Sequence, residues 1–291
     1  MRALGHMLIS SAAIILVGCG EPDLRSKAEA GDPVAQASLG FIYGVGDGVP
    51  KDYAESLKWF RKAADQGDAR GQYNLGVIYL RGDGVSKDYA ESLKWHRMAA
   101  DQGYVHAQYN LGVIYENGDG VPKDDVEAVK WYRKAADQGH ADAAFNFGLM
   151  YYNGLGVPKD VSEAAKWCRK AADKGLAEAQ FNLGVMCALG DGVTKDEAEA
   201  VKWYRKAAEQ GDAKAQYKLG LMFANGNGVP KDEVEAYAWY NLAAILIEEA
   251  RDRRGEMEKS LTREQKAQAQ QRSTELHKEI EPKMAARKAV K

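Results

Sequence analysis

The stretch of sequence that decides the fold is residues 107–139, AQYNLGVIYENGDGVPKDDVEAVKWYRKAADQG. Its Leu111-Gly112 pair recurs every 36 residues, and a tryptophan recurs at the same interval from Trp59 to Trp239. The equivalent pairs are Leu39-Gly40, Leu75-Gly76, Phe147-Gly148, Leu183-Gly184 and Leu219-Gly220. Six copies without an insertion predict a repeat array, in which each unit packs only against its neighbours and the surface serves binding more often than catalysis.

Each copy reads as two helices. In the unit from Asp68 to Gly103, we expect a first helix over residues 69–80, because apolar positions fall at i, i+4, i+7 and i+8 from Gly71. Gly76 lies inside this helix, where glycine costs about 1 kcal/mol relative to alanine. Since all six units carry a glycine at this place, we expect a neighbouring helix to approach closely there.

Glycines and acidic residues mark the boundary between the two helices. Gly82 and Gly84 follow the first helix, where glycine adopts the left-handed conformation that satisfies the last carbonyls. No Gly-Lys-Ser/Thr run or set of alternating carboxylates accompanies them, which disfavours a phosphate or calcium site. The second helix begins at Asp88, and Glu91 three residues later predicts a capping box. Every unit repeats this acidic pair, which favours capping over acid–base catalysis.

The third unit shows the shared motif well. It carries Ala107-Gln108, Leu111-Gly112, Tyr115, Gly118, Gly120-Val121, Lys123-Asp124, Lys130-Trp131, Lys134-Ala135-Ala136 and Gly139. The motif resembles the Sel-1-like repeat family, which is similar to tetratricopeptide repeats but has a longer unit. The resemblance covers residues 28–247 and implies an all-α fold, namely a right-handed α/α superhelical solenoid of six 36-residue helix-turn-helix repeats.

The segment after the repeats, residues 248–291, resembles the capping helix and tail that close such arrays. It begins as a polar extension, and Thr262 followed three residues later by Gln265 marks the start of a helix. A terminal unit must cover one apolar face and expose a polar one, which this charged segment suits. A basic tail follows from Lys283, and we expect it to be frayed.

The first 18 residues read as a signal peptide, with Arg2 ahead of an apolar run from Met7 to Val17 that is too short to span a bilayer. Residues 16–19, Leu-Val-Gly-Cys, resemble the bacterial lipobox, which implies cleavage before Cys19 and attachment of acyl chains such as palmitate. Residues 19–27 then form a tether and the start of a helix. Gly20 after the cysteine implies the outer membrane, facing the periplasm. If the cysteine is incidental, the chain is secreted or periplasmic.

Charge and the remaining cysteines limit the choice of partners. The chain has 40 basic and 42 acidic residues, so no basic excess is present to neutralise phosphates and nucleic acid is not expected as a partner. Cys168 and Cys187 could form a disulfide in an oxidising compartment. The alternative is two independent buried thiols at places that other units fill with aromatic residues.

The first helices carry residues that vary where the scaffold does not require variation. If these helices line the concave side, as the resemblance implies, their asparagines and rings would form a ladder for a partner polypeptide. Asparagine amides can hold an extended backbone by donor and acceptor, and aromatic rings give contact area at low entropy cost. The alternative is that the rings pack between units. The candidate residues are Arg70, Tyr73, Asn74, His106, Tyr109, Asn110, Asp142, Phe145, Asn146, Glu178, Phe181, Asn182, Lys214, Tyr217 and Lys218.

The sequence therefore predicts a non-catalytic, monomeric scaffold or adaptor of the bacterial cell envelope that binds a peptide or protein partner and needs no cofactor or metal. The alternative is a β-lactam-binding or hydrolysing enzyme, like the cysteine-rich branch of the family. That branch carries a cysteine pair in most units, which this chain lacks, and no Ser-x-x-Lys nucleophile is visible. His106 and His140 lie in adjacent units, but two imidazoles without a carboxylate partner favour surface residues over a zinc site.

Overall fold

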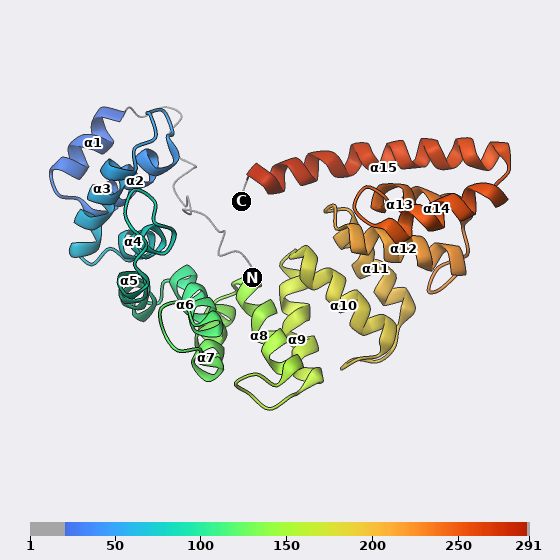
Figure 1. The fold of residues 1–291 in the computed structure, drawn as a ribbon, viewed down its shortest axis with the longest axis horizontal. Helices are drawn as coiled ribbons and strands as arrows, with labels where there is room; N and C mark the ends of the chain where they lie inside the picture. The colour runs from blue at the N-terminus through green and yellow to red at the C-terminus, as the bar shows by residue number, and fades with distance from the viewer. Residues whose placement is uncertain (1–20, 290–291) are drawn as a thin grey trace. The chain divides into compact units, whose positions relative to one another are not determined.

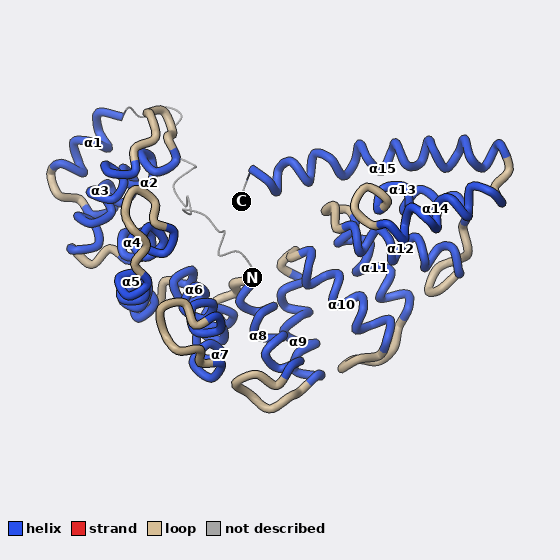
Figure 2. Tube along the Cα trace, in the orientation of Figure 1, coloured by secondary structure: helices blue, strands red, loops and turns tan. Residues whose placement is uncertain are grey.

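The computed structural model describes residues 21–289, which form helices and the turns between them, with no strand in this range (Figures 1 and 2). The predicted signal peptide, lipobox and Cys19 lie outside the described residues. The chain divides into two compact units, residues 1–143 (unit 1) and 144–291 (unit 2). Within residues 21–289, no helix combines the length and the apolar character needed to cross a membrane.

Unit 1 holds one N-terminal helix and three helical hairpins, followed by the start of a fourth. Its helices are α1 (Glu21–Glu29), α2 (Pro33–Val45), α3 (Tyr53–Asp65), α4 (Ala69–Arg81), α5 (Tyr89–Asp101), α6 (Val105–Asn117) and α7 (Asp125–Asp137), and α8 (Ala141–Asn153) begins in it. Within these three hairpins, α2 packs on α3, α4 on α5 and α6 on α7, while α3 packs on α4 and α5 packs on α6. The predicted first helix over residues 69–80 is confirmed as α4.

Unit 2 continues the same pattern and then closes it. Its remaining helices are α9 (Val161–Asp173), α10 (Ala177–Leu189), α11 (Glu197–Ala208), α12 (Ala213–Asn225), α13 (Glu233–Ala243), α14 (Glu248–Ser260) and α15 (Arg263–Ala289). The first helices of the six hairpins are thus α2, α4, α6, α8, α10 and α12, and the second helices are α3, α5, α7, α9, α11 and α13. The prediction of an all-α array of six repeats is confirmed.

The helix boundaries follow the predicted chemistry. Gly82 ends α4 with φ of 77°, and its N–H donates to the Ile78 carbonyl oxygen at 2.8 Å. Asp88 caps α5, because its side chain accepts from the Glu91 N–H at 3.0 Å. These contacts satisfy backbone groups that a helix end leaves without partners.

The predicted second half of the capping box is wrong. The Asp88 N–H donates instead to the Tyr79 carbonyl oxygen on the first helix, at 3.0 Å. Glu91 is thereby released from capping, and one carboxylate oxygen accepts from the indole Nε1–H of Trp95 at 2.8 Å. The same indole–carboxylate bond joins Trp59 to Glu55, Trp131 to Glu127, Trp167 to Glu163 and Trp203 to Glu199. The acidic pair therefore does two jobs, one at the helix end and one at the buried tryptophan.

The glycine of the Leu-Gly pair makes room for a ring of a neighbouring helix, which confirms the predicted close approach. A Cβ placed on Gly112 would lie 2.5 Å from the ring of Tyr132 in the second helix of the same hairpin. Tyr132 is fully buried, so the ring has no space into which to retreat. The hairpin closes only because this position has no side chain.

The C-terminal end contains one more helix than predicted, since the polar extension after the last repeat forms α14. The Thr262–Gln265 capping box is confirmed: the Thr262 N–H donates to Gln265 Oε1 at 2.9 Å, and the Gln265 N–H donates to Thr262 Oγ1 at 3.2 Å. The helix that it starts, α15, buries Leu276 and Ile280 and continues to Ala289 instead of fraying after Lys283.

The residue that anchors α15 is Glu235 of the last repeat. Arg272 on α15 donates from Nε to Glu235 at 2.5 Å. Glu235 is the equivalent of the glutamate that accepts the indole proton in the other repeats. As a result, Nε1 of Trp239 is buried with no hydrogen-bond partner among the residues described. Contact with the terminal helix thus replaces the bond that marks the other repeats.

Candidate binding surface

The charged and imidazole residues among the first-helix candidates of unit 1, Arg70, His106 and Asp142, are half-buried and contact neighbouring side chains. Arg70 lies 3.2 Å from the carboxylate of Asp68 at the start of its own helix. The ring of His106 packs edge-on against that of His140, with 5.2 Å between their centroids, and Asp142 interacts electrostatically with His106. The proximity of the two histidines, which are far apart along the chain, is a contact between adjacent repeats.

The rings predicted as a ladder pack inside the hairpins of unit 1. Tyr73 is 2% exposed, and its ring lies 5.6 Å from His96 and 5.3 Å from Tyr104. Tyr109 is half-buried and stacks on His140 at 4.7 Å between ring centroids. Tyr73 therefore packs against neighbouring rings of the fold, which agrees more closely with the alternative of structural packing than with an exposed ladder.

The asparagines of unit 1 are also withdrawn from the surface. Asn74 is 4% exposed and donates from Nδ2 to the Arg70 carbonyl oxygen at 2.9 Å. Asn110 is 8% exposed and donates from Nδ2 to Nε2 of His96 at 3.0 Å. Because both amides are buried and donate within their own fold, the structure disfavours the predicted peptide contacts of Asn74 and Asn110.

His140 has a structural role at the start of α8. Its Nδ1 accepts from the Ala143 N–H at 3.2 Å and so acts as the cap that Asp supplies at the start of α4 and α12. Burial lowers the pKa of His106, while Asp142 acts in the opposite direction. No group of three or more His, Cys, Asp or Glu residues within the described part of the chain is arranged to hold a metal ion.

Unit 2 keeps its first-helix charges at the surface. Glu178 and Lys214, on α10 and α12, are exposed, and Asn182 and Lys218, one turn further along the same helices, are half-buried. We call these four residues the first-helix face of unit 2. The neighbouring rings again pack inward: Phe181 lies 5.9 Å from Tyr204 and Tyr217 lies 5.9 Å from Tyr240. Phe145 is buried and Asn146 is half-buried, so the charged and amide residues provide the accessible chemistry.

The two cysteines are free, buried thiols and not a disulfide. The thiol of Cys168 donates to the Ala179 carbonyl oxygen at 3.3 Å. Burial raises the pKa of Cys168 to about 12 and also raises the pKa of Cys187. Both sulfurs are therefore protonated at neutral pH and poor nucleophiles. Cys168 stands where neighbouring repeats have Tyr132 and Tyr204.

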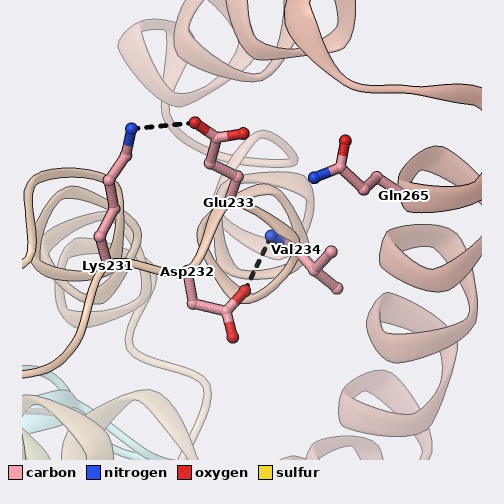
Figure 3. Close-up of a pocket in the computed structure, with 5 residues that line it drawn as sticks. All are labelled: Lys231, Asp232, Glu233, Val234 and Gln265. Atoms are coloured by element: carbon pink, nitrogen blue, oxygen red, sulfur yellow. Dashed lines mark hydrogen bonds and ion pairs between the residues drawn. The ribbon is translucent and has the colours of Figure 1, made fainter.

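An open pocket lies where α13 begins and α15 passes, and Figure 3 shows the five residues that line it. Lys231 points toward Glu233, with 2.9 Å between Nζ and Oε1. Asp232 caps α13 by accepting from the Val234 N–H at 2.9 Å, and Gln265 belongs to the capping box of α15. Each of these polar groups already serves a helix end or an ion pair, so the pocket supports a structural role.

Two recurrent devices escaped the sequence analysis. In the first, lysine ammonium groups lie over the buried tryptophans, as Lys134 does over Trp131 with 3.9 Å to the ring centroid. Arg97 of the preceding second helix covers the same ring from 4.8 Å. Such cation–π contacts are worth about 0.5–1 kcal/mol at exposed sites. The Lys-Trp-x-x-Lys spacing was the signal that could have revealed them.

In the second device, a pair of glutamines ties the two helices of a hairpin together. Gln138 donates from Nε2 to Gln108 Oε1 at 2.7 Å, and Gln108 in turn donates to the Ala100 carbonyl oxygen of the preceding hairpin at 3.2 Å. The other pairs are Gln66–Gln36, Gln102–Gln72 and Gln210–Gln180. We call each of these a glutamine clamp. The fourth repeat has Ala144 and Lys174 in these places and therefore lacks one.

The comparisons with known proteins agree with this architecture. A structure described as a protective antigen present in uropathogenic Escherichia coli strains displaying an SLR fold is 38% identical, with a TM-score of 0.80, and the match covers 92% of this chain and 58% of that one. A Sel1 repeat protein from Oxalobacter formigenes is 37% identical, with a TM-score of 0.69, and the match covers 78% of this chain and 99% of that one. No curated protein shows a significant match.

The family model described as "Sel1 repeat" matches six consecutive segments. They are residues 33–68, 69–104, 105–140, 141–176, 177–212 and 213–246. Each segment holds one first helix and one second helix of the structure. The chain therefore belongs to the Sel1 repeat family, whose members are generally scaffolds for protein interaction.

Proposed function

We propose that this protein is a non-catalytic scaffold of the bacterial cell envelope that binds a polypeptide through the first-helix face of unit 2. The observation that carries the proposal is the contrast between the invariant packing residues of α10 and α12 and the changing, accessible residues Glu178 and Lys214 beside them. Because these positions are accessible and differ in charge between repeats, they give the face a distinct chemical pattern that a partner can recognise.

The chemistry of this face suits an extended peptide that bears an acidic group. Lys214 and Lys218 lie one helical turn apart on α12 and can meet a side-chain or terminal carboxylate. On α10, Asn182 donates from Nδ2 to the Glu178 carbonyl oxygen at 2.8 Å, which leaves its amide oxygen to accept a backbone N–H of the partner. Unit 1 offers less, because its equivalent asparagines are buried.

Crosslinking in intact envelopes tests the face. We expect the wild-type chain to capture a defined polypeptide, and the double variant Lys214→Glu/Lys218→Glu to lose that capture because it reverses the charge presented to the partner. The matched control is Lys259→Glu/Lys278→Glu, which makes the same change at exposed positions of α14 and α15. Equal capture by all three chains would contradict the proposed face.

The envelope location rests on the predicted lipobox and needs its own test. We expect the wild-type chain to incorporate labelled palmitate and to remain with the membrane fraction, and Cys19→Ser to lose both properties. Retention of the label by Cys19→Ser would refute the anchor. Hydrolysis of a β-lactam by the purified chain, if it survives stringent purification, would contradict the non-catalytic role.

A further inference from the structure

One repeat holds a histidine where its neighbours hold a phenyl or phenol ring. His96 on α5 fills the space beside Gly76. In the adjacent hairpins, Phe60 fills the equivalent space beside Gly40 and Tyr132 fills the one beside Gly112. His96 is 0% exposed and is the fully buried histidine of the described residues. An apolar ring would suffice for packing, so the choice of an ionisable ring calls for a physical explanation.

The hydrogen bonds of His96 fix its neutral form. Nδ1 lies 2.8 Å from the Ser92 carbonyl oxygen, which can only accept, so Nδ1 carries the proton. Nε2 is then an acceptor, and the Asn110 amide of α6 donates to it at 3.0 Å. The Asn110 amide also hydrogen-bonds the Tyr73 hydroxyl on α4. Three helices thus meet around one imidazole that has no room for a second proton.

No charged group compensates for that proton. The neighbours are Ser92 on α5 itself, Gly76 and Tyr73 on α4, and Asn110 on α6. Tyr73 is the titratable group among them, and burial raises its pKa further, so it stays neutral throughout the physiological range. If His96 were protonated, its Nε2–H would point at the amide N–H of Asn110, so two donors would face each other. No carboxylate is in contact with the ring to stabilise the added positive charge.

We propose that His96 is an acid sensor, and that its protonation opens the packing of α4 and α5 against α6. The site goes beyond the proposed scaffold role and does not depend on which partner is bound. Reversal of the Asn110 amide would turn its oxygen toward the new N–H, and the Tyr73 hydroxyl could rotate to donate to the same oxygen, but the positive charge would stay buried without a carboxylate in contact. The network is therefore neutral and fully hydrogen-bonded at neutral pH, whereas in acid it would hold a buried positive charge with no compensating anion.

The sign and size of the effect follow from proton linkage. Burial lowers the pKa of His96 to about 4, from 6.5 for an unperturbed imidazole. In this pH range, His96 therefore binds a proton in the open segment but not in the closed one. The closed packing of α4 to α6 loses stability as pH falls below about 6.5. Between pH 7 and pH 5, these values raise the opening equilibrium of the segment about 20-fold.

Carboxylates do not act in the same window. The hydrogen bond from Lys130 lowers the pKa of Glu127, so that contribution is present above about pH 4.5 and is lost only in stronger acid. His106, whose pKa is also lowered by burial, titrates in the histidine window but lies half-buried on α6. A variant of His96 separates the two histidines.

Hydrogen exchange measured by mass spectrometry on the full chain at pH 7, 6 and 5, corrected for the intrinsic exchange rate, tests the proposal. We expect opening of peptides from α4 to α6 to rise about 20-fold from pH 7 to pH 5, and peptides from α10 to α12 to change much less. His96→Phe, which copies Phe60, should flatten the response. The control His277→Gln changes an exposed histidine of α15 and should leave it intact.

Asn110→Asp provides an independent second variant if His96→Phe does not fold. It places a carboxylate 3.0 Å from Nε2, which would stabilise the imidazolium, so the acid response should vanish or reverse. The proposal is overturned if wild-type α4–α6 and α10–α12 respond alike to pH. It is equally overturned if the response of α4–α6 persists in His96→Phe, or, where that variant does not fold, in Asn110→Asp.

Discussion

At the scale of single residues, the missing side chain of Gly112 determines how tightly a hairpin closes. The ring of Tyr132 occupies the place that a Cβ would take, and its hydroxyl donates to Glu116 at 2.5 Å. The Tyr132 ring is thus fixed by two contacts, one with the backbone at Gly112 and one between its hydroxyl and the Glu116 carboxylate. Overpacking such a site forces the backbone apart.

We expect Gly112→Ala to destabilise the chain by about 1–3 kcal/mol, since the added methyl group overlaps the Tyr132 ring. The control is Gly255→Ala in α14, where a Cβ would meet nothing within 4 Å. That change should stabilise by about 0.5–1 kcal/mol through helix propensity alone. Urea unfolding followed by circular dichroism measures both; a Gly112→Ala chain as stable as wild type would refute the close approach.

The residue scale also shows where sequence reasoning succeeded and failed. Asp88 was predictable as a cap because its role depends on residues within one helical turn. The burial of Asn74 and Asn110 was not, since a periodic pattern identifies the face of a helix and not how deeply a neighbouring hairpin covers it. The role of Glu91 was mistaken because the Asp88 N–H already had a partner on another helix.

At the scale of helices, the glutamine clamps join the two helices of a hairpin and the carbonyl of the hairpin before it. The buried amides are satisfied on both sides, which is the condition under which such groups stabilise a fold. The fourth repeat lacks both glutamines and has Ala144 and Lys174 in their places. The sixth repeat keeps only the first-helix member: Gln216 is buried and donates to the Ala208 carbonyl oxygen at 3.2 Å, but Leu246 stands in the place of its partner.

We expect Ala144→Gln alone to destabilise by about 1–3 kcal/mol, because its amide oxygen would be buried without the donor that a glutamine at position 174 supplies. Ala144→Gln together with Lys174→Gln should recover that loss through a coupling energy of about 0.5–3 kcal/mol. A double-mutant cycle on thermal unfolding, with Lys174→Gln as the second single variant, measures the coupling. Strict additivity of the two changes would show that the clamp does not transfer to this hairpin.

At the scale of the whole chain, the repeat count and the fold class were predictable because each unit repeats one pattern that folds against its neighbours. The closing segment was predicted only in part. The capping box at Thr262 could be identified, but α14 was missed, since its sequence lacks an apolar stripe and buries only Ala250. The docking of α15 depends on Arg272 and Glu235, which are 37 residues apart, and no local pattern links them.

We expect Arg272→Ala to loosen α15 by about 1 kcal/mol, since the contact is charged but partly exposed. Amide exchange in α15 should accelerate several-fold, while α10 stays unchanged. Arg253→Ala breaks an exposed pair with Glu256 and serves as the control, with an effect below about 0.5 kcal/mol. Exchange in α15 that is equally fast in the two variants would argue against Glu235 as the anchor.

The diversion of Glu235 to α15 limits how the gene can lengthen. A duplicated module appended after Trp239 would meet a surface that the terminal helix already occupies, and a neighbouring glutamate that is already committed. New copies are therefore accommodated more readily between existing ones, where the glutamate of each repeat is still bonded to its own tryptophan. Expansion of this protein is therefore easier in the middle of the array than beyond the repeat that α15 covers.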